Sequence, residues 1–396
     1  MTDSTAPIVL VGGGLAAGTA VTELREQGYD GPLVLFTDEQ HLPYERPPLS
    51  KGYLMGKDSA DSALVHDAAW YAEHGVDVRT GARVEAIDPG AHSVRAGGAD
   101  LTYRSLLLAT GSRPRHLALA DDSGAPVTYL RTIDDSTALR EQLQPERRIG
   151  IIGGGWIGLE VAAAAREAGA EVVVLEALAQ PLLRVLGPEV AAVFADLHRK
   201  HGVDLRTDTQ VESIATTDAG VVIGVAGGSP VTVDHLVVGV GVSPTTELAE
   251  AAGIGVDNGI RTDATLLTSA PDVYAAGDVA NVDHPVLKRP VRVEHWDTAI
   301  QHGKVAAANL LGGDKVADAL PYFFTDQYDL GMEYVGSPGP EGFDRVHIAG
   351  DVSGLNFRAW WLRADLVVAG MHVNDWDAID RIREQVGTHA SEADLS

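Results

Sequence analysis

Two glycine-rich turns are the residues of this sequence best suited to chemistry. Each turn follows a short apolar run and precedes an alanine-rich segment. A glycine turn between a strand and a helix lets the backbone approach a pyrophosphate, whose charge then lies among the unpaired N–H groups of the helix N-terminus. The pattern G-x-G-x-x-G is complete in the second turn, whereas Ala17 replaces the third glycine of the first. The residues expected at the two nucleotides are Gly12, Gly14, Leu15 and Ala16 in the first turn and Gly153, Gly155, Ile157 and Gly158 in the second.

A carboxylate follows each turn at the end of the next predicted strand. Glu176 lies about 20 residues after Gly155, and a similar spacing separates Asp38 from Gly14. An acid at this position accepts a hydrogen bond from a ribose 2′-OH and repels a 2′-phosphate, so Glu176 predicts NADH in preference to NADPH. A turn without a ligand is the alternative for either motif alone, and two complete units of strand, glycine turn, helix and strand, each with its acid, favour two dinucleotide sites. The motif itself does not say which site takes FAD, because FAD and NAD present the same ADP half.

Composition excludes several other classes of function. The chain has no cysteine, which excludes disulfides, thiolate metal sites, Fe–S ligation and any cysteine redox relay. The net charge of -26 repels nucleic acid and anionic membrane surfaces. No H-E-x-x-H or similar spacing predicts a metal site, and the apolar runs are far shorter than the ~20 residues of a membrane-spanning helix. We expect a soluble cytoplasmic protein without a metal, a nucleic-acid partner or a membrane span.

The elements that position the turns occur twice. Each copy reads as strand, glycine turn, helix and strand, which predicts two nested, doubly wound α/β domains of the Rossmann type. Short aromatic-bearing strands begin near Pro321 and favour a small α+β C-terminal domain. Pro271–Asp278 is expected to return to the first domain. The expected domains are residues 1–115 with 246–319 for the first nucleotide, 116–245 for the second, and 320–396 at the C-terminus.

Four further strings carry a resemblance to a known family. They are Leu42–Lys51 (LPYERPPLSK), Leu107–Pro114 (LLATGSRP), Gly239–Pro244 (GVGVSP) and Tyr274–Asp278 (YAAGD). With the turns, they resemble the flavoproteins that have two dinucleotide-binding domains. Leu42–Lys51 is similar to the FAD-dependent NADH:ferredoxin reductases of oxygenase systems, the group that contains the putidaredoxin, rubredoxin and biphenyl-dioxygenase reductases. The resemblance covers nearly the whole chain and implies that the N-terminal site takes FAD and the central site NADH.

The resemblance also implies roles in the cofactor sites. It places Asp38 on the adenosine ribose of FAD, Val84 on the adenine, Arg131 near the pyrophosphate, Asp278 on the ribityl chain and Trp296 at the pyrimidine edge of the flavin. The matching strings add Thr110, Gly111, Gly241 and Gly277 to the expected cofactor-binding residues.

Two residues are expected to be catalytic by the same resemblance. Similar reductases place a lysine, here Lys51, beside the flavin and pair it with a carboxylate near the nicotinamide, here Glu160. A cation beside the flavin suits the negative charge that reduction builds at N1 and N5. The alternative for Glu160 is an acid stabilised by the helix dipole. Arg184 resembles the family's arginine near the adenosine of NAD or is a surface residue, and Phe324, where relatives commonly carry tryptophan, is either an aromatic near the flavin or a packing residue.

The implied reaction is electron transfer from NADH through FAD to a [2Fe–2S] ferredoxin that feeds an oxygenase such as a cytochrome P450 or a ring-hydroxylating dioxygenase. The missing cysteines exclude relatives that use a dithiol. The alternatives are an NADH-responsive interaction protein similar to apoptosis-inducing factor and an NADH oxidase. Because ferredoxins are usually acidic, docking requires a basic patch, for which Lys288, Arg289 and Arg292 are the expected cluster on a monomer or homodimer.

Overall fold

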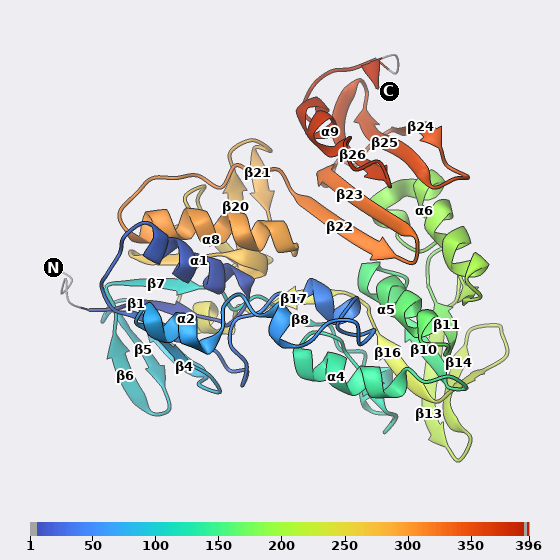
Figure 1. The fold of residues 1–396 in the computed structure, drawn as a ribbon, viewed down its shortest axis with the longest axis horizontal. Coiled ribbons are helices and arrows are strands. Elements are labelled where there is room, and N and C mark those ends of the chain that lie inside the picture. The colour runs from blue at the N-terminus through green and yellow to red at the C-terminus, as the bar shows by residue number, and fades with distance from the viewer. Residues whose placement is uncertain (1–5, 392–393, 396) are drawn as a thin grey trace. The chain divides into compact units, whose positions relative to one another are not determined.

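The computed structural model describes residues 6–391, 394 and 395, and the chain forms two compact units (Figure 1). Unit 1 contains the chain up to Arg46, together with Ala60–Arg113 and Ser243–Pro321. Unit 2 contains Pro47–Ser59, Pro114–Val242 and the chain from Tyr322 onward. Strands β8 (Ser112–Pro114) and β17 (Val242–Pro244) carry the chain out of unit 1 and back into it.

Unit 1 is built on a five-stranded parallel sheet with the order β19-β7-β1-β2-β3. Strands β1, β2 and β7 are buried at every position, as in a sheet covered on both faces. Their residues are all apolar except Ser105. Because β2 and β7 flank β1, the strand order reverses beside β1, at the edge where a ligand binds in such sheets. The strands are β1 (Ile8–Val11), β2 (Leu33–Phe36), β3 (Val76–Arg79), β7 (Ser105–Leu108) and β19 (Val273–Ala275).

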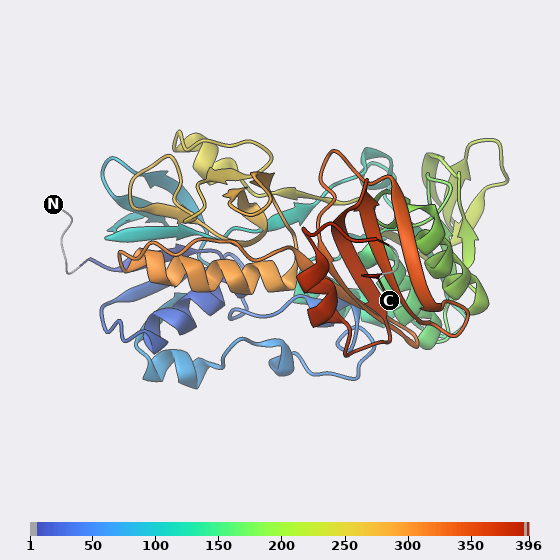
Figure 2. The same ribbon diagram turned by 90° about the horizontal axis from the view of Figure 1, so that it is seen from above.

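Strand β19 pairs in parallel with β7, so the chain returns to the first sheet as the sequence predicts. Helices α1 (Leu15–Glu26) and α8 (Trp296–Leu310) lie side by side (Figure 2). The remaining elements of unit 1 are α2 (Ala68–Glu73), α7 (Glu247–Ala251), the short 3-10 helices η2 (Asp61–Ala63) and η3 (Gly277–Val279), an antiparallel sheet of β4 (Val84–Asp88), β5 (Ser93–Ala96) and β6 (Ala99–Thr102), and a sheet of β18 (Ile260–Thr262), β20 (Ala280–His284) and β21 (Arg289–Val291).

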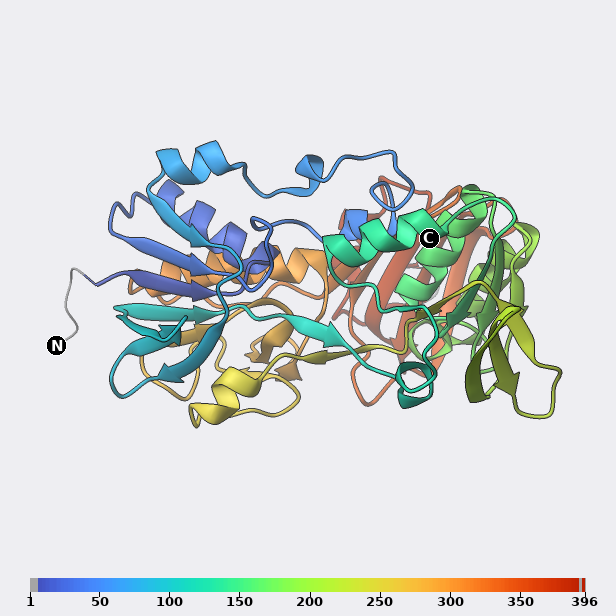
Figure 3. The same cartoon turned by 90° about the horizontal axis from the view of Figure 1, so that it is seen from below.

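Unit 2 repeats the plan with a parallel sheet in the order β12-β11-β10-β16-β9. Its strands are β9 (Val127–Thr128), β10 (Arg148–Ile152), β11 (Glu171–Leu175), β12 (Asp204–Arg206) and β16 (His235–Val238). The helices of unit 2 that precede its C-terminal part are η1 (Pro47–Ser50), α3 (Ala118–Asp121), α4 (Ile133–Gln142), α5 (Trp156–Glu167) and α6 (Leu183–Lys200). The hairpin of β13 (Val211–Thr217) and β14 (Gly220–Val225), with β15 (Val231–Val233), projects from this unit (Figure 3).

The C-terminal part of unit 2 is an antiparallel sheet with the order β22-β23-β26-β25-β24 and one helix, α9. The sheet shares a hydrophobic core with α6, because Trp361 packs in the same cluster as Phe194 and donates a hydrogen bond to the carbonyl of Leu186 (3.0 Å). The elements are β22 (Tyr322–Gln327), β23 (Leu330–Gly336), β24 (Arg345–Asp351), β25 (Asn356–Arg363), β26 (Leu366–Val373) and α9 (Ile379–Gln385).

The α/β class with two nucleotide-binding folds is confirmed. The two units differ from the three predicted domains in two places. The chain from Tyr322 onward belongs to unit 2 together with the second nucleotide-binding fold. Pro47–Ser59 also packs with unit 2, because Leu54 and Met55 join the core cluster that contains Ile151. Among the described residues, none of the helices is long and apolar enough to cross a membrane. The same part of the chain holds no cluster of three or more histidine or acidic side chains suited to a metal ion.

Candidate cofactor and catalytic site

The first glycine turn connects β1 to α1. Gly12 has a φ of 120°, which favours glycine, and a Cβ there would lie 2.1 Å from the carbonyl oxygen of Ala109. Its N–H donates to the carbonyl of Phe36 (2.8 Å). The close contact between the ends of β1, β2 and β7 therefore requires glycine at this position.

The second turn is built in the same way between β10 and α5. Gly153 has a φ of 104°, and a Cβ there would lie 2.4 Å from the carbonyl oxygen of Gly239. A Cβ at Gly158, inside α5, would lie 2.2 Å from the carbonyl oxygen of Gly153. The first and third glycines of this motif therefore allow the helix to pack closely on the strand.

The second glycine of each G-x-G pattern is not required by a close backbone contact of this kind. Gly14 and Gly155 have φ values of -90° and -79°, which any residue adopts, and a Cβ at either meets no described atom within 4 Å. Each is the N-cap of its helix, and neither helix has a side-chain cap or an acidic residue in its first turn. A phosphate held against these backbone N–H groups explains both glycines and both uncapped helices. The two turns thus fit two pyrophosphate groups.

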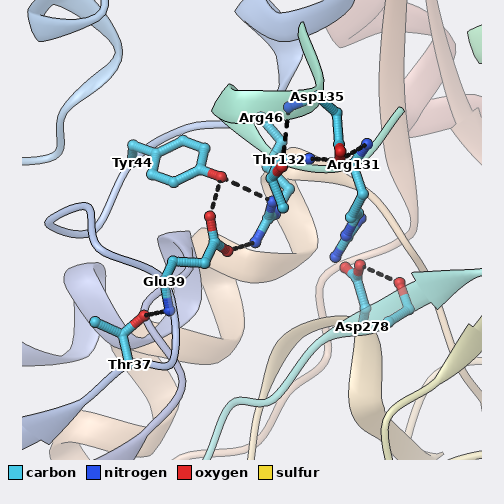
Figure 4. Close-up of polar contacts among 9 residues, drawn as sticks. Thr37, Glu39, Tyr44, Arg46, Arg131, Thr132, Asp135 and Asp278 are labelled. Atoms are coloured by element: carbon cyan, nitrogen blue, oxygen red, sulfur yellow. Dashed lines mark hydrogen bonds and ion pairs between the residues drawn. The ribbon is translucent and has the colours of Figure 1, made fainter. Parts of the chain in front are cut away.

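The carboxyl end of β2 carries the acid expected at the first nucleotide. Asp38 is exposed there, whereas the neighbouring Glu39 is held by Arg46 (2.9 Å) and by the hydroxyl of Tyr44 (2.5 Å). Figure 4 shows the side chains of Glu39, Tyr44 and Arg46 pointing toward one another. Burial lowers the pKa of Arg46, but attraction to Tyr44, Glu39 and Asp278 outweighs burial and raises it. The sequence pattern singles out Asp38 and not Arg46, although Arg46 lies within the string Leu42–Lys51.

The residues expected around the rest of the first nucleotide lie at the same edge of the sheet in unit 1. Asp278, which Figure 4 labels, follows β19. It accepts a hydrogen bond from Ser112 (2.8 Å). Gly277 has a φ of 73°, and a Cβ there would lie 3.1 Å from the Cβ of Ala16 on α1. Trp296 begins α8, and its indole N–H donates to Glu45 (3.0 Å).

The other predicted residues of this group follow the strands. Thr110 and Gly111 follow β7, and the hydroxyl of Thr110 donates to the carbonyl of Thr245 (2.7 Å). Val84 is buried at the start of β4, two residues after Ala82, whose N–H donates to the carbonyl of Thr37 (2.8 Å). The structure therefore brings the predicted first-site residues that follow β1, β2, β7 and β19 to one edge of the sheet in unit 1. Arg131 and Lys51 belong to unit 2.

In unit 2, Glu176 lies directly beneath its glycine turn. One carboxylate oxygen accepts from the N–H of Gly154 (2.6 Å) and the other from that of Leu178 (2.8 Å). Arg184 is exposed on α6, two residues after Leu182, whose N–H donates to the carbonyl of Gly154 (3.1 Å). Ile157 is 45% exposed on the first turn of α5, and Gly241 follows β16.

Lys51 and Glu160 form a buried ion pair, as the resemblance implies. The ammonium lies 2.7 Å from Oε1 of Glu160, and the two side chains are 15% and 4% exposed. Thr325 also donates to Oε1 (2.6 Å), and Ser50 donates to Oε2 (2.5 Å). The ring centre of Phe324 lies 5.4 Å from the ammonium, so this aromatic belongs to the same cluster. A surface carboxylate at a helix N-terminus would not be buried among three donors, so the helix dipole alone does not explain Glu160.

The expected basic patch is only partly exposed. Lys288 and Arg289 lie at the turn between β20 and β21, with Lys288 exposed and Arg289 half-buried. The side chain of Arg292 is only 10% exposed, pairs with Glu294 and donates to the carbonyl of Asp278 (3.2 Å). Arg292 therefore stabilises the loop that carries Asp278 and offers little exposed charge to a docking partner. The sequence could not show this, because an arginine beside two other cations has no local sign of burial.

Histidine protonation is expected to limit stability in acid. His302 on α8 is buried and accepts a hydrogen bond from the N–H of Gly277 (3.2 Å). Burial lowers its pKa to about 4. As the pH falls from about 6.5 toward 4, the unfolded chain binds a proton that the folded chain excludes, so stability falls by up to about 1.4 kcal/mol per pH unit for this group. His302→Gln should reduce that slope in urea unfolding between pH 7 and pH 5, and an unchanged slope contradicts the assignment.

Two glycine turns at the switch points of two parallel sheets define a protein with two dinucleotide sites. The chain belongs to the pyridine nucleotide-disulphide oxidoreductase family, whose sequence model matches residues 6–303. It is 43% identical over 371 residues to the ferredoxin–NAD(+) reductase component of the anthranilate 1,2-dioxygenase system of Burkholderia cepacia, covering 93% of this chain and 91% of that protein. It is 38% identical over 374 residues to putidaredoxin reductase of Pseudomonas putida, covering 93% and 88%.

The solved structures agree with these relatives. The structure of the covalent putidaredoxin reductase–putidaredoxin complex matches with a TM-score of 0.92 and 36% identity, covering 98% of this chain and 95% of that chain. The resemblance to the ferredoxin reductases is therefore confirmed, and the chain is an oxidoreductase of that kind.

Proposed function

We propose that this protein takes a hydride from NADH and passes single electrons to a [2Fe–2S] ferredoxin that supplies an oxygenase, such as a cytochrome P450 or a ring-hydroxylating dioxygenase. One NADH would reduce two ferredoxins and release one proton. The observation that carries the proposal is a pair of uncapped glycine turns joined in one chain with the buried Lys51–Glu160 pair. The names of the relatives, which are reductases of ferredoxins in oxygenase systems, support the acceptor. We propose the cytoplasm, where NADH is supplied, as its location.

The FAD is proposed to bind in unit 1. The N–H groups at Gly14 would hold the pyrophosphate, Asp38 the adenosine ribose and Val84 the adenine, while Asp278 would hold the ribityl chain and Trp296 the flavin edge. We add Arg46 as a further cation for the pyrophosphate, in addition to Arg131, which the resemblance implies. Bound FAD supplies the change from two-electron to one-electron chemistry that a chain without cysteine lacks. We propose residues 1–115 and 246–319 as the FAD domain, apart from Pro47–Ser59.

The NADH is proposed to bind in unit 2. The N–H groups at Gly155 would hold its pyrophosphate and Glu176 its ribose, and Arg184 would lie near its adenosine. An ionised carboxylate accepts about four hydrogen bonds. Glu160 already accepts three, two at Oε1 and one at Oε2. The remaining position on Oε2 suits the N–H of a carboxamide, so Glu160 would orient the nicotinamide while Lys51 supplies positive charge beside the flavin.

The alternative outputs are not favoured. A dithiol output is impossible because the chain has no cysteine. An NADH oxidase requires that the reduced protein reacts with oxygen. An NADH-responsive interaction protein requires that the reduced protein persists. The test is NADH-dependent cytochrome c reduction with and without an added [2Fe–2S] ferredoxin. We expect turnover to depend on the ferredoxin. NADH consumption at the same rate without the ferredoxin, with peroxide or water formed in place of reduced cytochrome c, supports the oxidase instead.

Replacing Glu176 tests the nucleotide preference. Glu176→Ala removes the expected ribose acceptor and the charge that repels a 2′-phosphate. We expect the KM for NADH to rise about tenfold and the preference for NADH over NADPH to narrow by a similar factor. The measurement is kcat/KM with each nucleotide, and Glu171→Ala, at the exposed start of the same strand, is the matched control. An unchanged NADH/NADPH ratio refutes the role of Glu176.

A further inference from the structure

A line of buried hydrogen bonds leads away from Glu160 within unit 2. Thr325 donates to Glu160 (2.6 Å), and the side-chain amide of Gln327 donates to the hydroxyl of Thr325 (3.1 Å). Nε2 of His198 lies 2.8 Å from the Oε1 of Gln327, and the hydroxyl of Tyr328 lies 3.4 Å from Nδ1 of His198. Four consecutive contacts thus connect Glu160 on α5 to Tyr328 after β22, through His198 on α6.

The direction of this line follows from its first member. A carboxylate paired with Lys51 can only accept, so the hydroxyl of Thr325 must donate to it. Thr325 then accepts from the amide nitrogen of Gln327, which turns the amide oxygen toward His198. That oxygen can only accept, so the imidazole proton lies on Nε2 and Nδ1 accepts from Tyr328. Every donor points toward Glu160, an arrangement in which each bond strengthens the next.

The surroundings keep the line intact. Thr325, Gln327 and His198 are each 1% exposed or less, and water does not compete with bonds at such positions. Burial lowers the pKa of His198 to about 4, with the hydrogen bond to Gln327 raising it and His201 lowering it further. His201 stacks on Tyr328 with ring centres 3.7 Å apart. The imidazole is therefore neutral at pH 7, as the direction of the line requires.

We infer that His198 is a positioning residue for Glu160: through Gln327 and Thr325, His198 holds the carboxylate of Glu160 turned toward Lys51. The inference rests on the proposed function for its consequence, since Glu160 is the proposed partner of the nicotinamide. The groups that face Glu160 are Lys51 and the carboxylate of Asp326 on β22, which is itself near Glu333. Neither belongs to the line, so both remain in place when His198 is changed.

The first test is independent of NADH. Nitrogen-15 NMR of the histidine-labelled holoprotein at pH 7 reports which imidazole nitrogen carries the proton, and the signal of His198 is assigned by its loss in His198→Phe. We expect a neutral ring protonated at Nε2. A ring protonated at Nδ1 reverses the direction of the line and overturns the inference.

The second test is a double-mutant cycle on flavin reduction by NADH at pH 7, measured by rapid mixing over a range of NADH concentrations. His198→Phe keeps a ring in the core but removes the donor, and Thr325→Val removes the hydroxyl that reaches Glu160. Because the line orients Glu160 toward the proposed nicotinamide site, each variant should lower the rate constant at saturating NADH by about fivefold. The double variant should be no slower than Thr325→Val alone. His198→Gln and Thr325→Ser, which keep the donors, should reduce the flavin at the wild-type rate.

The outcomes separate the two proposals. A rate constant of His198→Phe that matches the wild type, or a loss of rate that adds in full to that of Thr325→Val, overturns the role of His198. If His198→Phe does not fold, the loss of the signal in His198→Gln assigns His198 instead, and the NMR measurement on the wild type still decides. If NADH does not reduce the wild-type flavin, the proposed function fails, whereas the NMR test of the line stands.

Discussion

Lys51→Met is expected to destabilise the protein by about 3 to 5 kcal/mol and to abolish most flavin reduction by NADH. The substitution leaves the carboxylate of Glu160, 4% exposed, without its counter-charge. Removing one partner of a buried pair is far more costly than removing both, because the remaining charge stays out of water. The double variant Lys51→Met/Glu160→Met should therefore recover most of the lost stability while flavin reduction remains slow.

An exposed pair provides the matched control. Lys57 and Glu167 form a salt bridge of 2.8 Å in the same unit, with side chains 61% and 35% exposed. Lys57→Met should cost less than about 1 kcal/mol, the ordinary value of a surface pair. The free energy of unfolding is measured in urea for the wild-type holoprotein and for the three variants. Equal losses for Lys51→Met and Lys57→Met would contradict the burial argument, and a double variant no better than Lys51→Met would contradict the pairing.

Gly155→Ala is expected to weaken NADH binding by about 30-fold or more while the fold survives. A Cβ at this position meets no described protein atom and the backbone is ordinary, so only the ligand opposes it. Charge-assisted hydrogen bonds to a phosphate contribute about 1.5 to 3 kcal/mol, which corresponds to this factor. Gly158→Ala differs, because its Cβ would lie 2.2 Å from the carbonyl oxygen of Gly153 and must displace backbone.

The two alanine variants should therefore differ in which property they lose, NADH affinity or thermal stability. Gly155→Ala should melt close to the wild type without NADH, apart from about 1 kcal/mol from the less favourable N-cap. Gly158→Ala should lose several degrees in Tm. Thermal unfolding without NADH and NADH titration measure the two effects. If Gly155→Ala binds NADH as tightly as the wild type, the pyrophosphate does not contact this turn.

The features that the sequence predicts well are local. Both glycine turns, the acids at Asp38 and Glu176 and most strands follow from short patterns, because one turn and one buried strand are each encoded within about ten residues. The pair of Lys51 and Glu160 follows only from resemblance. Their neighbours are distant in the chain, with Ser50 and Glu160 separated by 110 positions and Glu160 and Thr325 by 165.

The features that the sequence does not predict depend on such distant contacts. The transfer of Pro47–Ser59 to unit 2 depends on Leu54 meeting the core around Ile151. The core shared by α6 and the C-terminal sheet, and the line from Glu160 to His198, depend on side chains that meet only after the sheets have formed. A histidine with no motif around it reads as a packing residue in the sequence, and only its partners reveal its position in the line.

The most direct test of the central claim is an anaerobic titration. The NADH-reduced holoprotein is mixed with a [2Fe–2S] ferredoxin in its oxidised form, and the ferredoxin and flavin absorbances are followed together. The proposal predicts reoxidation of the flavin with two ferredoxins reduced per NADH consumed. A flavin that NADH reduces but that stays reduced in the presence of excess ferredoxin would contradict it.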